Sequence, residues 1–145
     1  MKATAAAALV VLAAVLASRG AVAGGFDGTR DLICAPVQIM ECEIGEACKQ
    51  IRAEEIDLAS FFRVKFKEKR IVGVRTDGLE RSAAFERVGR MDGKLVLQGA
   101  ESAVEGRKGG IGWTMAISAD SGKMVLSVSG DEVGFVIFGP CTCEK

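Results

Sequence analysis

The chain contains no histidine and no tyrosine among its 145 residues. Without histidine, no imidazole can act as a base near neutral pH or complete a metal site, which excludes the commonest hydrolase designs and most zinc sites. Proline occurs twice and tryptophan once, as Trp113. Among the side chains present, only a cysteine thiol has an ordinary pKa close to neutrality. We therefore expect no catalytic residue, no metal and no cofactor, and look first at the cysteines for chemistry.

The N-terminus has the three parts of a secretory signal peptide. Lys2 precedes an apolar run at residues 3–17, and small residues lead up to Ala23. The apolar run is shorter than the roughly 20 residues that a membrane helix needs, so a retained anchor is the less favoured alternative. We expect cleavage after Ala23 and export to the periplasm or the medium. The mature chain, residues 24–145, should then contain no membrane span.

The mature segment would have 122 residues, which suits one domain. Lys2 and Arg19 leave with the leader, so 17 basic residues face 19 acidic ones and the net charge is about −2. This balance favours no nucleic-acid partner.

Past the leader, short alternating runs of apolar and polar residues are separated by Gly, Asp and Ser, which is typical of β-strands. The clearest is the run 62–67, and Asp92-Gly93 predicts a tight hairpin because both residues tolerate positive φ. Eight strands are expected, at residues 32–41 with an interruption at Pro36, 62–67, 71–75, 82–91, 94–99, 111–118, 123–129 and 133–138. Residues 42–50 and 103–110 are expected to be loops, and residues 53–57 a single helical turn.

This pattern predicts a single all-β domain, an antiparallel meander of about eight short strands closed into a small barrel; a two-sheet sandwich is the alternative. Trp113 should face the interior together with the other large inward residues, Phe62, Phe66, Met115, Ile117, Phe135 and Ile137. Eight short strands should leave the lumen nearly full. The alternative is that Trp113, Phe62, Phe66 and Phe135 line a cavity for a small apolar ligand at the barrel mouth.

Several motifs occur in a fixed order: Cys34-Ala35-Pro36, the pair Cys42 and Cys48, Trp113 followed by residues 120–123, and the ending at residues 138–141. In this arrangement the chain resembles a group of small exported bacterial proteins of uncharacterised function. The resemblance covers nearly the whole mature chain and implies an exported single domain, but no activity. In that pattern Cys141 resembles the usual terminal cysteine and Cys143 an addition.

Five cysteines allow several pairings, so the choice depends on geometry. We favour Cys42–Cys48, which closes a short loop, and Cys34–Cys141, which joins the opening strand to the closing strand that a closed meander places beside it. Cys143 is then a free thiol. An incidental thiol is the favoured interpretation; the alternatives are a covalent dimer through Cys143, disulfide exchange with Cys141, and capture of a soft metal.

Five basic residues line the outer face of one strand and its turn: Arg63, Lys65, Lys67, Lys69 and Arg70. They could meet an anionic partner, but a solvated face that discourages edge pairing is favoured. The acidic residues around the cysteine loop match no calcium motif, and the glycine-rich stretch 106–110 lacks the spacing of a phosphate loop.

A binding function is therefore favoured over catalysis. The chain is expected to be an exported binding or interaction module for a small apolar ligand or a protein partner. These two differ in cavity volume, which the sequence does not give. The alternative function is a thiol-disulfide redox protein that uses Cys141 and Cys143.

Overall fold

The structure, a computed structural model, describes residues 25–75, 77–102 and 109–145. The expected leader and part of the expected loop at 103–110 lie outside these residues. Within them the chain forms one short 3₁₀ turn, η1 (Ala53–Ile56), where a helical turn was expected, and eleven strands. The strands are β1 (Leu32–Cys34), β2 (Gln38–Glu43), β3 (Lys49–Ile51), β4 (Phe62–Lys65), β5 (Arg70–Val74), β6 (Glu80–Ala84), β7 (Arg87–Met91), β8 (Lys94–Glu101), β9 (Ile111–Ser118), β10 (Lys123–Ser129) and β11 (Val133–Cys143).

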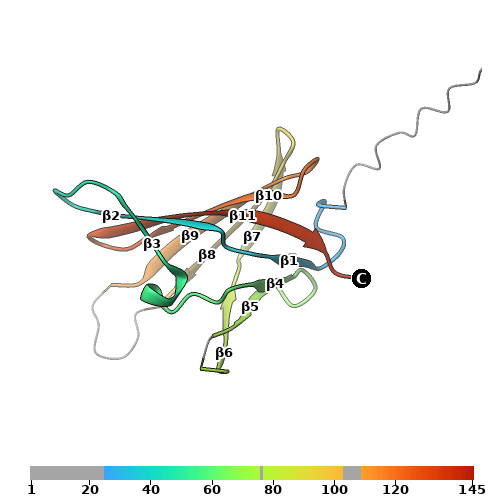
Figure 1. Cartoon of the computed structure of the whole chain (residues 1–145). Helices are drawn as coiled ribbons and strands as arrows, with labels where there is room; N and C mark the ends of the chain where they lie inside the picture. Colours follow the sequence, from blue (N-terminus) through green and yellow to red (C-terminus); the bar gives the residue numbers. More distant parts are fainter. Residues whose placement is uncertain (1–24, 76, 103–108) are drawn as a thin grey trace, which may run out of the picture.

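The strands form one antiparallel sheet in the order β6-β5-β4-β1-β11-β10-β9-β8-β7, with β2 pairing with β11 and β3. Figure 1 shows that this sheet is strongly curled, as a half-barrel, so that β4 to β6 face the long strands β8 to β11. The all-β, antiparallel fold class is confirmed. The connections are a meander from β4 to β6 and from β7 to β11, and β1 lies between the two runs because it pairs with both β4 and β11. No helix among the described residues is long and apolar enough to cross a membrane.

The strand count of eight is wrong, and Pro36 accounts for one extra strand. The expected strand at 32–41 is divided into β1 and β2 on either side of it. Ala35 N–H donates to the carbonyl of Pro140 at 3.0 Å and Val37 N–H donates to that of Phe138 at 2.8 Å, so this segment stays beside β11 while it bends. β1 can then pair with β4 while β2 pairs with β3, because proline supplies no N–H to continue one straight ladder.

The other two extra strands arise from a disulfide-closed hairpin and from a corner. β3 lies at the end of the expected loop 42–50, because Cys48 pairs with Cys42 and continues the β2–β3 register. The expected strand at 82–91 breaks between β6 and β7. There Phe85 turns inward, its N–H donates to Lys69 O at 3.0 Å, and the N–H of Glu86 donates to Gln98 O at 2.9 Å. The chain thus passes from the β5 side to the β8 side. The last strand, expected to end at residue 138, continues to Cys143.

One end of the curled sheet is closed by residues 25–31. A Cβ at Gly28 would lie 3.4 Å from Leu95 and 3.5 Å from Phe66, and the ring of Phe26 lies against Gly122 in the β9–β10 turn. The carboxylate of Asp31 accepts the N–H of Phe66 at 3.0 Å. This segment therefore covers the end of the core that contains Phe66 and Phe85, and it leaves the opposite end, where β9 begins, as the place where a site can form.

Candidate functional site

A cavity of about 550 Å³ occupies the end of the curled sheet opposite residues 25–31. Its walls come from the segment that follows β3, from β4 to β6 and from β8 to β11. They are mainly apolar and include Phe62, Ile71, Trp113, Leu126, Phe135 and Ile137. Exposed residues of β6, Glu80, Arg81 and Ser82, also line it, so the cavity opens to solvent. The expectation of a nearly full lumen is wrong.

Small residues on neighbouring strands leave this space. Gly73, Ser82 and Ala83 line it from β5 and β6. On β8, Gly99 pairs with Trp113, and a Cβ at Gly99 would lie 2.5 Å from Cζ2 of the indole and 2.7 Å from its Cε2. Only glycine at this position allows the indole to lie this close to the β8 backbone. A large aromatic side chain is thereby held at the wall, and the space beside it stays open.

Two polar groups of the cavity lack hydrogen-bond partners among the described residues. Trp113 is only 6% exposed, and its Nε1–H is buried without an acceptor. Arg75 binds Asp57 Oδ1 at 2.9 Å and Asp77 Oδ2 at 3.1 Å, in each case through Nη2. Its Nε–H is also buried without an acceptor. Indole and guanidinium groups only donate hydrogen bonds. Both of these N–H groups are covered by surrounding protein atoms and do not reach the space of the cavity.

Of the four aromatic residues proposed as ligand-lining, the structure brings Phe62, Trp113 and Phe135 together around the cavity. Phe66 is a correction. It follows the last residue of β4, in the turn that leads to β5, and its ring packs edge-to-face on Phe85 with centroids 6.1 Å apart. The reversal of the chain places it at the closed end of the sheet. Sequence reasoning missed Arg75 altogether.

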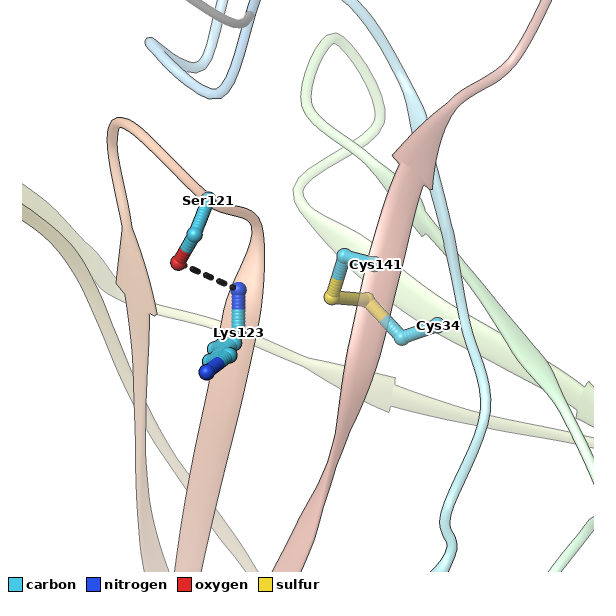
Figure 2. Close-up of a disulfide and its surroundings, with 4 residues drawn as sticks. All are labelled: Cys34, Ser121, Lys123 and Cys141. Atoms are coloured by element: carbon cyan, nitrogen blue, oxygen red, sulfur yellow. Dashed lines mark hydrogen bonds between the residues drawn. A yellow bond between two sulfur atoms is a disulfide. The ribbon is translucent and has the colours of Figure 1, made fainter.

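The two disulfides join Cys34 to Cys141 and Cys42 to Cys48, which are the pairs favoured from the sequence. The first links directly paired residues of β1 and β11 with Cα atoms 4.0 Å apart. Figure 2 shows this bridge beside the β9–β10 turn, where Lys123 N–H donates to Ser121 Oγ at 3.4 Å. The second closes the β2–β3 hairpin, with Cα atoms 4.2 Å apart.

Cys143 is a free, half-buried thiol. It lies two residues beyond Cys141 on the same extended strand, so the two side chains are on one face but separated by about 6.6 Å, since a strand rises about 3.3 Å per residue. A disulfide requires Cβ atoms about 3.8 Å apart. Exchange between Cys141 and Cys143 would therefore require β11 to lose its extended form and β1 to lose its bridge.

The five basic residues lie along the β4–β5 hairpin. Arg63 Nε lies 3.0 Å from Glu144 Oε1, and Lys65 Nζ lies 3.3 Å from Glu68 Oε1. Arg70 donates to the hydroxyl of Ser82, while Lys67 and Lys69 are exposed in the turn. Because three of the five basic side chains have partners within the chain, this arrangement favours a solvated face over an anion-binding patch.

Two of the acidic residues near the cysteine loop, Glu41 and Glu43, form ion pairs within the β2–β3 hairpin. Lys49 Nζ lies 3.0 Å from Glu41 and 3.7 Å from Glu43. The side-chain hydrogen bond to Glu41, together with the charges of both carboxylates, raises the pKa of Lys49. In the described part of the chain, no three His, Cys, Asp or Glu side chains come together as metal ligands.

Comparisons with protein-family models, curated proteins and solved structures found no match.

Proposed function

We propose that this chain is an exported domain that binds a small, mainly apolar ligand inside its curled sheet. The observation that carries the proposal is the cavity, whose volume of about 550 Å³ falls within the roughly 300–1,000 Å³ common for ligand sites. Its apolar walls with a few polar groups are also typical of such sites. A ligand carrier and a protein-interaction module differ in cavity volume, and a cavity of this size favours the carrier.

Export is supported by the leader sequence and by the two disulfides, because structural disulfides persist mainly in oxidising compartments. Protein recovered from the periplasm or the medium should begin Gly24-Gly25-Phe26 when sequenced from its N-terminus. Recovery of the chain with Met1 intact, and only from the cytosol, would contradict export.

The redox alternative is less favoured. Cys141 is buried and engaged with Cys34, and a redox pair with Cys143 would require β11 to unravel. Reactive thiols are often found at helix N-termini, whereas Cys143 is the last residue of strand β11.

Blocking the cavity tests the proposed function. Ala83 is half-buried and lines the cavity, whereas its neighbour Ala84 is exposed. Ala83→Leu should weaken binding of a hydrocarbon probe such as octane by about tenfold or more, because a buried isobutyl group would fill the space that the probe needs. Ala84→Leu is the matched control and should leave binding unchanged.

The readout is the emission of Trp113, since this residue is the chain's single tryptophan and no tyrosine is present. A saturable change in emission on adding octane, reduced in Ala83→Leu and retained in Ala84→Leu, would support the proposal. Equal effects of the two substitutions would place the probe outside the cavity and contradict it.

A further inference from the structure

We infer that two copies of this chain associate through the outer face of their long strands. The outer face is the side of β8, β9, β10 and β11 that is turned away from the cavity. β4 to β6 lie on the inner side of these strands, so they do not cover it (Figure 1). The inference goes beyond the proposed function and does not depend on it, because a ligand would bind inside the curled sheet.

A row of apolar side chains crosses the outer face. Val96 of β8 pairs with Ala116 of β9. Val125 of β10 lies between Ala116 and Phe138 of β11. Val125 is 37% exposed and Phe138 is 39% exposed, although both belong to central strands of the sheet. A Cβ at Gly112 would meet no atom within 4 Å, so the described part of the chain leaves the face open there too. Another molecule could therefore remove this row from water.

Charge is nearly absent from the outer face. Residues of β8 to β11 alternate between the interior and this face, and only two of the outward positions are charged, Lys94 and Lys123. They begin β8 and β10, which run in the same direction, so both lysines lie at one end of the strands. The β4–β5 hairpin, by contrast, presents five basic residues, which is more typical of a solvated strand face.

The lack of charge favours a second copy as the molecule that covers this face. A two-fold axis brings the same patch of both copies together, so a patch of large net charge would repel itself. When the strands of the two copies run antiparallel, Lys94 and Lys123 of one copy lie at the opposite end from those of the other. Complementary charge selects between unlike partners, and the outward strand positions offer little of it.

The face is also large enough for a reversible dimer. β7 and β2 flank the four long strands, so six strands about 4.8 Å apart give a layer roughly 29 Å wide. The seven residues of β10 make it roughly 23 Å long. Two twisted sheets can pack face to face, and covering most of this layer would bury about 600 Å² on each copy, or about 1,200 Å² in total. This total is at the lower end for specific interfaces, so we expect dissociation in the micromolar range.

Sedimentation velocity of the purified exported protein tests the inference. All samples carry Cys143→Ser, which removes the free thiol and with it any dimer through a disulfide at this position. The sedimentation coefficient should rise from that of a monomer to that of a dimer between about 1 and 100 μM, and the change should reverse on dilution.

Two variants place a carboxylate on the outer face of both copies. Val125→Glu interrupts the apolar row, and Ser127→Glu adds a charge at the next outward position of β10, which is exposed, without removing an apolar side chain. Each should weaken association by at least about tenfold, because like charges then face each other across the interface. Leu79→Glu is the matched control, since Leu79 is 63% exposed and precedes β6, on the other side of the curled sheet. It should leave association unchanged.

The circular dichroism of each variant shows whether the sheet still forms, and Ser127→Glu decides the matter if Val125→Glu does not fold. A protein that stays monomeric at about 100 μM overturns the inference. So does a dimer that both outer-face variants leave intact, or one that Leu79→Glu weakens as strongly, because association would then use another surface. None of these results bears on octane binding, so the proposed function is tested separately.

Discussion

The two disulfides should differ markedly in what they contribute to stability, because they close loops of very different length. Cys34 and Cys141 are 107 residues apart in the sequence, whereas Cys42 and Cys48 are separated by 6. In the chain-entropy model, the long closure raises the free energy of unfolding by about 4–5 kcal/mol and the short one by about 2 kcal/mol. The double substitution Cys34→Ala with Cys141→Ala should therefore lose about twice as much stability as Cys42→Ala with Cys48→Ala.

Urea unfolding followed by the emission of Trp113 measures this difference. Trp113 is the single tryptophan and is buried between β8 and β10, so its emission reports loss of the curled sheet. The denaturant slope should increase in the variant that lacks the long closure, since its unfolded chain is more expanded. Free energies extrapolated to water, and not midpoints alone, must then be compared.

Cys143→Ser is the control, because this half-buried thiol closes no loop; it should change stability by less than about 1 kcal/mol. The reasoning is refuted if removing the long closure costs no more than removing the short one. That result would mean that β1 and β11 stay associated in the unfolded chain, or that the disulfides act mainly through their local packing.

Three further predictions concern backbone, surface and protonation. Gly122→Ala should lower stability clearly more than Gly45→Ala does. Both glycines have a left-handed backbone, which alone costs roughly 1–2 kcal/mol on substitution, but only at Gly122 would the new Cβ also meet a backbone atom, at 2.6 Å. Urea unfolding of the two variants measures the difference. Lys67→Glu should change stability by less than about 1 kcal/mol, since Lys67 is exposed, and a larger loss would mean that the basic face is covered in solution. By nuclear magnetic resonance, the Nζ of Lys49 should titrate above its ordinary pKa of 10.5, and Glu41→Gln should lower that midpoint. The stabilisation of the folded state by the Lys49–Glu41 pair is present at neutral pH and is lost as the pH rises through the raised pKa.

Local patterns in the sequence were sufficient for the fold class and for several elements. The alternation that begins at Phe62 predicts β4, and Asp92-Gly93 predicts the β7–β8 turn, where both residues have positive φ, 46° and 70°. These features depend on the side-chain period of a strand and on the φ preference of single residues, which a sequence displays directly.

The topology could not be predicted in the same way, because it depends on pairing between distant segments. β1 has 3 residues and lies between β4 and β11, whose nearest paired residues are about 30 and 110 positions away in the chain. The corner at Phe85 likewise requires hydrogen bonds to β8 and to the turn before β5. The alternation of apolar and polar residues in the sequence continues through this corner, so the sequence does not show where one strand ends and the next begins.

The cavity depends on the same kind of information. Along β9, Trp113 and Ile117 both face inward, and their alternation predicts core positions of one kind. Their partners on β8 differ: Ile117 pairs with Leu95, whereas Trp113 pairs with Gly99. Two leucines, Leu95 and Leu97, fill the interior at one end of β8, and at the other end Gly99 lets the indole of Trp113 pack directly against the β8 backbone. The sequence of one strand therefore cannot show whether its aromatic residue packs in the core or lines a cavity. This depends on the residue opposite it on the neighbouring strand, which for Trp113 is Gly99.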